Sequence, residues 1–137
     1  KKIPIVFSPN MSIGVNLLFN LVREAASSLP QDYKANIIEA HHTHKKDAPS
    51  GTAKFLADII RQVRGQEDID IKSIREGEIV GDHDIVFDSP WDTIKLSHRA
   101  KTRDIFAKGA LEAAKFVVRK KSGLYSMADV LKEMTNE

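Results

Sequence analysis

Three histidines and a lysine lie within one stretch of five residues, at His41, His42, His44 and Lys45. An imidazole titrates near neutral pH, so each histidine can donate or accept a proton under physiological conditions. The lysine ammonium adds a full positive charge to the same stretch. This combination of residue types predicts acid–base chemistry on a small anionic substrate.

A helix start follows these residues. Ser50, Gly51 and Thr52 come directly after the Asp47-Ala48-Pro49 break, and an apolar pattern of helical spacing continues behind them. The first N–H groups of a helix lack intrahelical acceptors and carry partial positive charge, which suits a carboxylate or a phosphate. Gly51 would allow close approach to the backbone, and Lys45 would add its charge to the same anion.

Two plainer interpretations stay open. Clustered histidines are typical of zinc sites, and on an extended segment His42 and His44 would point to one side and His41 to the other. Adjacent lysines repel a cation, and no cysteine or obvious carboxylate completes a ligand set, so we expect no metal and rank a metal-dependent hydrolase lowest. Ser50 could also cap an ordinary helix, although the histidines beside it make this the weaker explanation.

Strand and helix patterns alternate along the first half of the chain and position this cluster. The expected elements are a strand at 3–7, a helix from Ser12 to Ala26, a strand at 33–40 and a helix that ends at Gly65. The second strand would deliver His41 and His42 at its carboxyl end. Ser12 is the expected N-cap of the first helix, and Ser50, Gly51 and Thr52 open the second.

The second half begins with β patterns. Residues 69–98 alternate inward and outward positions, and Gly77, Gly81 and the turn at 88–90 divide them into an expected antiparallel meander. A helix is expected at 105–120 and a short helix at 127–134, capped by Ser126. The order of elements predicts one α+β domain with a mixed sheet.

The composition fits a globular protein with a small-molecule partner. The chain has 137 residues, of which 42% are hydrophobic and 29% are charged, and it has no cysteine. A formal net charge of +2 does not favour nucleic acid, which needs a clustered excess of basic residues. No apolar run approaches the roughly 20 residues of a membrane span. We expect a cytoplasmic protein without nucleic-acid or membrane partners.

The string from Glu39 to Ala53 reads Glu-Ala-His-His-Thr-His-Lys-Lys-Asp-Ala-Pro-Ser-Gly-Thr-Ala. It resembles, almost residue for residue, the substrate-site signature of the dihydrodipicolinate reductases. Residues 6–16 are similar to the family's loop that contacts the nicotinamide. Further similarity lies at Gly81-Asp82-His83, Ser97–Ala100, Arg103, Phe106-Ala107 and Ser122–Tyr125. The resemblance covers essentially the whole chain.

The resemblance implies a fold and an assembly. The fold is α+β, with a mixed open sheet and helices mainly on one face, and residues 1–137 are a substrate-binding, catalytic and oligomerisation domain. The family is usually a homotetramer through this part of the chain. The strands expected at 84–87 and 93–98 can join edges or faces between subunits, so we expect a homotetramer.

The resemblance also implies roles for individual residues. His41 matches the family's proton donor, and Lys45 matches a second acid that assists at the ring nitrogen or the bound carboxylate. Ligands of the substrate carboxylates are implied at His42, Ser50, Gly51 and Thr52. Arg103 matches an arginine near the nicotinamide and the substrate. The implied reaction is the reduction of 4-hydroxy-tetrahydrodipicolinate, a cyclic imine dicarboxylate, by NADPH or NADH in the diaminopimelate route to lysine.

The cofactor is expected to be only partly contacted by these residues. Ser8, Pro9, Asn10 and Met11 match the loop that orients the nicotinamide. In the family a Rossmann domain with a glycine-rich phosphate loop comes first, but none of the seven glycines here has Gly-x-Gly spacing. We expect that half to be encoded upstream; if the protein lacks it, the chain is a dicarboxylate-binding pseudo-enzyme. The segment 66–78 is shorter than in many members, so we map no contact onto it.

Overall fold

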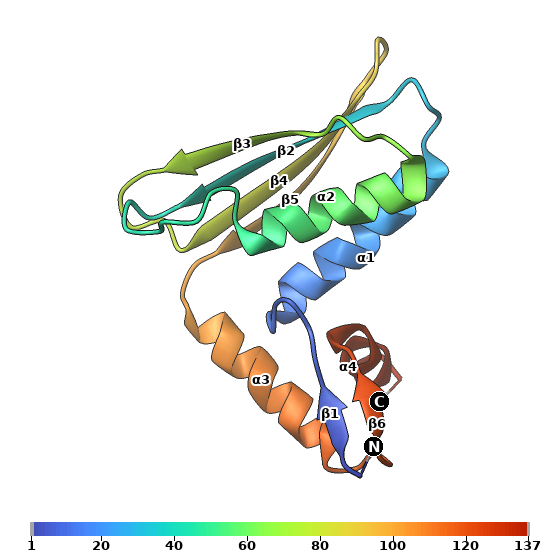
Figure 1. Cartoon of the computed structure of the whole chain (residues 1–137), viewed down its shortest axis with the longest axis vertical. Helices are drawn as coiled ribbons and strands as arrows, with labels where there is room; N and C mark the ends of the chain where they lie inside the picture. Colours follow the sequence, from blue (N-terminus) through green and yellow to red (C-terminus); the bar gives the residue numbers. More distant parts are fainter. Residues whose placement is uncertain (1, 137) are drawn as a thin grey trace. The chain divides into compact units, whose positions relative to one another are not determined.

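The computed structural model describes residues 2–136, which divide into two compact units. We call Leu18–Lys101 the sheet unit, and the segments before and after it together the flanking unit. In chain order the elements are β1 (Pro4–Val6), α1 (Ile13–Ser28), β2 (Lys34–His41), α2 (Gly51–Arg64), β3 (Asp70–Arg75), β4 (Gly81–Asp88), β5 (Thr93–Ala100), α3 (Asp104–Val117), β6 (Gly123–Tyr125) and α4 (Met127–Met134) (Figure 1).

The sheet unit is built on a four-stranded mixed sheet of order β3-β2-β4-β5. β4 pairs antiparallel with both β2 and β5, and the β4–β5 pair is a hairpin. β3 pairs in parallel with β2, with Asn36 opposite Asp70. The expected antiparallel meander over 69–98 is therefore wrong for β3. The α2 crossover returns the chain to run in the direction of β2, so β3 joins the free edge of that strand.

One face of this sheet is covered by helices. α2 lies along it with α1 beside it, and Phe19 of α1 contacts Phe55 of α2 edge to face at a centroid distance of 4.7 Å (Figure 1). Odd-numbered positions of β2 and β4 point to this face and are buried, whereas even-numbered positions are partly exposed. The covered face therefore presents a regular array of inward side chains, and the site is built from this array.

The ends of α2 are set by local chemistry, as expected from the sequence. Ser50 caps its start by accepting a hydrogen bond from the Ala53 N–H. Gly65 ends it in the left-handed conformation, with φ of 66°, and donates its N–H to the carbonyl of Arg61. A residue with a Cβ is strained at this φ, which explains the glycine.

The flanking unit has a small parallel sheet of β1 and β6, in which Ile5 lies opposite Leu124. β6 was not expected, because three residues are too few to display an alternating pattern. Ala113 and Phe116 of α3 pack against Met127 and Val130 of α4 to form the core of this unit.

The boundaries of α3 and α4 can be compared with the helices expected at 105–120 and 127–134. α3 ends at Val117, three residues before the expected end, because the N–H groups of Arg119 and Lys120 bond to carbonyls three positions back and the chain turns. α4 begins at the expected cap, Ser126, and Asp129 completes a capping box there.

The fold is thus α+β with open mixed sheets, as expected. Among residues 2–136, no helix combines the length and the apolar character needed to cross a bilayer.

Candidate functional site

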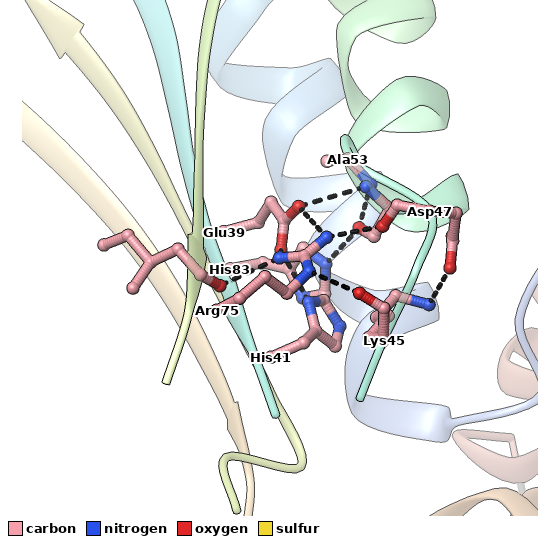
Figure 2. Close-up of polar contacts among 9 residues, drawn as sticks. Glu39, His41, Lys45, Asp47, Ala53, Arg75 and His83 are labelled. Atoms are coloured by element: carbon pink, nitrogen blue, oxygen red, sulfur yellow. Dashed lines mark hydrogen bonds and ion pairs between the residues drawn. The ribbon is translucent and has the colours of Figure 1, made fainter. Parts of the chain in front are cut away.

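Glu39 lies at the centre of the site and has a relative exposure of 0%. It occupies an inward position of β2, two residues before His41. A buried carboxylate needs hydrogen bonds or opposite charges to offset its lost hydration. The side chains of Arg75 and His41 supply them (Figure 2). The backbone N–H of Ser50 donates one more hydrogen bond.

His41 is the last residue of β2 and is 8% exposed. Its Nδ1 lies 2.5 Å from Glu39 Oε2. An ionised carboxylate can only accept, so Nδ1 carries the hydrogen and Nε2 is left to exchange a proton. A Cβ placed on Gly81 would lie 3.1 Å from this Nε2, so the glycine leaves the ring its room.

Arg75, at the end of β3, clamps the carboxylate and the loop before α2. Its two terminal nitrogens donate to the two oxygens of Glu39 at 2.8 Å each. Nε donates to the carbonyl of Lys45 at 3.3 Å, and one terminal nitrogen also donates to the carbonyl of Asp47 at 2.6 Å. The guanidinium therefore fixes the path of the loop that carries the expected substrate ligands (Figure 2).

Ser50 joins Glu39 to the start of α2. Its backbone N–H donates to Glu39 Oε1 at 3.1 Å, and its Oγ accepts from Ala53. Because this Oγ already accepts, its hydrogen can be donated to His83 Nε2, which lies 3.1 Å away. Gly51 and Thr52 occupy the first helical positions, and a Cβ on Gly51 would meet no atom of the described chain within 4 Å.

Lys45 lies in the loop and pairs with Asp47, at 2.9 Å between Nζ and Oδ1. The segment from His42 to His44 is not extended, contrary to expectation. Lys45 donates its N–H to the carbonyl of His42 and closes a turn, which leaves the two imidazole rings 6.3 Å apart. His42 is partly exposed and His44 is exposed. The loop therefore leaves the side chains of Lys45 and His42 partly exposed to solvent.

Burial and charge set the ionisation of the site. Burial raises the pKa of the Glu39 carboxyl, but hydrogen bonds from Arg75 and His41 outweigh this effect and lower it to about 2. Burial lowers the pKa of His41, and Glu39 opposes that change. Burial also lowers the pKa of His83 to about 4, aided by the nearby His41. At neutral pH the site therefore holds an ionised Glu39 beside a neutral His83.

Glu39, Arg75 and His83 were missed by sequence reasoning. The alternation of β2 did place Glu39 on the same face as Ile37 and His41, and a carboxylate at an inward position signals a buried cation nearby. Arg75 carried no comparable signal, because its partner strand was assigned incorrectly and no contact was mapped onto 66–78.

The expected cofactor residues Ser8, Pro9, Asn10 and Met11 belong to the flanking unit, where a buried side chain shapes their loop. Asn16 donates from Nδ2 to the carbonyls of Asn10 and Ser12, at 2.7 and 2.8 Å. The Asn10 side chain accepts from the Ser12 N–H at 2.8 Å. Ser12 Oγ accepts from the Val15 N–H and so is the expected cap of α1.

Close packing holds the other side of this loop. A Cβ on Gly109 of α3 would lie 1.7 Å from the carbonyl oxygen of Met11, so only glycine fits there. Arg103, the remaining expected site residue, also belongs to the flanking unit. It precedes α3, is exposed and makes no side-chain capping bond.

Within residues 2–136, no group of three or more His, Cys, Asp or Glu side chains is arranged to hold a metal ion. His41, Ser50 and the carbonyl of Lys45 instead converge on the Glu39–Arg75 pair. What this arrangement offers is a proton-exchanging imidazole close to a helix N-terminus.

The chain matches the family described as "Dihydrodipicolinate reductase, C-terminus" over residues 14–131. It is 45% identical to a 4-hydroxy-tetrahydrodipicolinate reductase of Nitrosomonas eutropha, over 96% of this chain and 56% of the relative. It is 48% identical to the protein of that name from Methanoregula boonei, over 94% of this chain and 56% of the relative.

A solved structure is similar as well. A dipicolinate-bound dihydrodipicolinate reductase from a Paenisporosarcina species matches with a TM-score of 0.77 at 28% identity, over 91% of this chain and 53% of that one. The chain therefore spans about half the length of the relatives that it matches.

Proposed function

This chain belongs to the dihydrodipicolinate reductase family, as its C-terminal domain, and from that membership we propose that it binds a cyclic imine dicarboxylate and protonates it during reduction. The substrate is 4-hydroxy-tetrahydrodipicolinate, in the diaminopimelate route to lysine. One observation carries the proposal: the Glu39 carboxylate accepts hydrogen bonds both from the imidazole of His41 and from the backbone N–H of Ser50, the N-cap of α2. A proton donor and an anion site are thereby joined through one side chain.

The anion site is the start of α2. Gly51 and Thr52 occupy the first turn of α2, where the helix dipole favours negative charge. The open space over Gly51 lets a carboxylate approach the backbone. Lys45 and His42 contribute a charge and an imidazole N–H from the loop. Lys45 exchanges its partner Asp47 for the substrate carboxylate when the ligand binds.

His41 is the proton donor. Reduction delivers a hydride to the unsaturated ring and leaves an electron-rich carbon that must take up a proton. The imidazolium of His41 releases its Nε2 proton to that carbon and keeps its Nδ1 hydrogen on Glu39. Lys45 assists as a second acid at the ring nitrogen or the bound carboxylate.

NADPH or NADH supplies the hydride when bound. By resemblance, the loop from Ser8 to Met11 contacts the nicotinamide end, and Asn16 and Gly109 hold its backbone in place. Arg103 matches, by resemblance, an arginine of the family near the nicotinamide and the substrate. No glycine-rich phosphate loop occurs in the chain, so the rest of the dinucleotide is held by protein outside these residues.

We also infer that the protein assembles as a homotetramer. The support is the family resemblance and the face of the sheet turned away from α2, where even-numbered positions such as Ile38 and Val86 remain partly exposed. Sedimentation that finds only monomers at micromolar concentration would contradict this assembly.

Titration calorimetry with dipicolinate tests the anion site on this chain. We expect saturable binding that Lys45→Ala weakens by about tenfold or more, since a charge-assisted contact is lost. Lys46→Ala is the matched control, because it removes the neighbouring exposed lysine. No binding by the wild-type chain, or equal losses in both variants, would remove the basis of the proposal.

The competing function is a dicarboxylate-binding module without redox chemistry. It is favoured only by the missing Gly-x-Gly spacing. Dipicolinate binding with no turnover in a longer protein that includes this chain would establish it.

A further inference from the structure

The Glu39–Arg75 pair contacts more of the site than any other described pair of side chains. Glu39 bonds to the proton donor and to the cap of α2, while Arg75 bonds to both Glu39 oxygens and to two loop carbonyls (Figure 2). In the function proposed above Glu39 only links His41 to Ser50, and Arg75 has no role. Both come from strands of the rigid sheet, which suits them to hold a loop that must meet a ligand.

We propose that Glu39 and Arg75 form one positioning unit. Glu39 fixes the Nδ1–H tautomer of His41 and the start of α2, and Arg75 opposes the stabilisation of the His41 imidazolium by the Glu39 carboxylate. The inference rests on the proposed function for the role of His41 as proton donor. Its structural content, the control of His41 by two opposite charges, can be tested without that role.

The two charges act on His41 in opposite directions. The Glu39 carboxylate, 2.5 Å from Nδ1, favours the imidazolium, and without a counter-charge it would hold that cation as a tight ion pair. The guanidinium of Arg75 occupies both carboxylate oxygens and disfavours a second cation beside it. The result is an imidazolium that is oriented by Glu39 and still releases its proton readily, as a general acid must.

Other groups around His41 act in the direction of Arg75. From the loop, Lys45 is a cation whose charge disfavours the imidazolium. From β4, the His83 ring lies 5.2 Å away and is neutral at pH 7, so it contributes little charge there. Among the largest influences on the His41 pKa, Glu39 is the group that raises it, and Arg75 is its direct counter-charge.

The pair also connects His41 to the start of α2 and to the loop that precedes it. Glu39 Oε1 holds the Ser50 N–H, and Arg75 holds the carbonyls of Lys45 and Asp47. Moving the carboxylate would therefore displace the anion-binding helix start and the proton donor together. A residue that acts in this way positions the reacting groups without touching the substrate.

Histidine NMR on this chain tests the proposal directly, because long-range nitrogen–proton spectra report both the tautomer and the pKa of each ring. We expect Glu39→Gln to lower the pKa of His41 and to mix its tautomers at high pH, since the carboxylate acceptor is lost. We expect Arg75→Gln to raise the pKa of His41, since the opposing cation is lost. Asp58→Asn is the control, because it removes an equal charge at the exposed surface of α2 and should leave His41 unchanged.

Opposite shifts in the two variants support the proposal. Unchanged titration, or shifts in the same direction, overturns it, because a purely structural role predicts no opposition of sign. If Arg75→Gln does not fold, Arg75→Lys decides: it retains the cation but cannot span both Glu39 oxygens and the loop. It should leave the His41 pKa close to wild type and weaken dipicolinate binding about tenfold. A His41 pKa raised in Arg75→Lys as well would contradict the charge argument.

The same samples separate the two levels of the account. Opposite pKa shifts in a chain that does not bind dipicolinate would uphold the positioning unit and reject the proposed function. Dipicolinate binding with no effect of either variant on His41 would do the reverse.

Discussion

The network around Glu39 and the loop from Ser8 to Met11 are held in place by different means. In the sheet unit, a charged pair fixes His41 and the start of α2 through hydrogen bonds between side chains and backbone. In the flanking unit, the loop is shaped by one amide side chain, Asn16, and by backbone contact with Gly109. Substitutions that change the charge of a side chain should therefore perturb the network around Glu39, whereas substitutions that add volume should perturb the loop from Ser8 to Met11.

The largest effect is expected from volume in the flanking unit. Gly109→Ala would place a methyl group 1.7 Å from the carbonyl oxygen of Met11, so α3 or the loop must move. We expect a loss of at least about 3 kcal/mol of unfolding free energy in urea titrations, as for a severe overpacking. Gly51→Ala is the matched control, since a Cβ there meets nothing within 4 Å. Equal stability of the two variants would show that the contact at Met11 is not tight.

The buried ionisable groups of the sheet unit should make the free energy of unfolding depend on pH. The pKa of His83 in the folded chain is lowered to about 4. Its contribution to the free energy of unfolding is therefore complete above its ordinary pKa near 6.5 and is lost as the pH falls from there towards 4. The folded pKa of Glu39 is lowered to about 2, so its contribution is lost between about 4.5 and 2. Each step amounts to about 3 kcal/mol by proton linkage.

Urea unfolding at a series of pH values measures both steps. His83→Gln should shrink the upper step, to which His41 also contributes through its lowered pKa, and leave the lower step in place. Glu39→Gln should remove the lower step. A flat stability profile between pH 7 and pH 4 in the wild-type chain would contradict the assigned burial of His83.

The smallest effect on stability, but a clear one on binding, is expected at the helix start itself. Gly51→Ala should fold as well as the wild type, because alanine is the better helix former. Its methyl group would stand in the space that a carboxylate needs, so we expect dipicolinate affinity to fall about tenfold. Calorimetry and thermal melting on the same sample separate the two effects. Unchanged affinity would place the anion elsewhere.

The two regions also differ in how much could be read from sequence. The start of α2 at Ser50 and Gly51, its end at Gly65 and the position of His41 at the end of a strand were correctly predicted, since each depends on neighbouring residues. The role of Arg75 was not, because it depends on β3 pairing in parallel with β2, across a helix of 14 residues. Local pattern cannot report which edge a strand joins.

The flanking unit illustrates the same limit in another way. Gly109 and Met11 lie far apart in the chain, and their contact left no pattern in either segment. β6 was too short to alternate and became recognisable only through its pairing with β1. By contrast, Glu39 could have been found, since the other inward positions of its strand are apolar except for His41.

The most direct measurement of the central claim is NADPH oxidation with freshly made substrate, by this chain and by a longer protein that includes it. We expect turnover only in the longer protein, because a dinucleotide held at its nicotinamide end alone binds too weakly for hydride transfer. In that protein His41→Gln should lower kcat by about 100-fold, as for loss of a general acid, whereas His44→Gln, at an exposed position, should not. Wild-type kcat in His41→Gln, or equal turnover by this chain alone, would contradict the account.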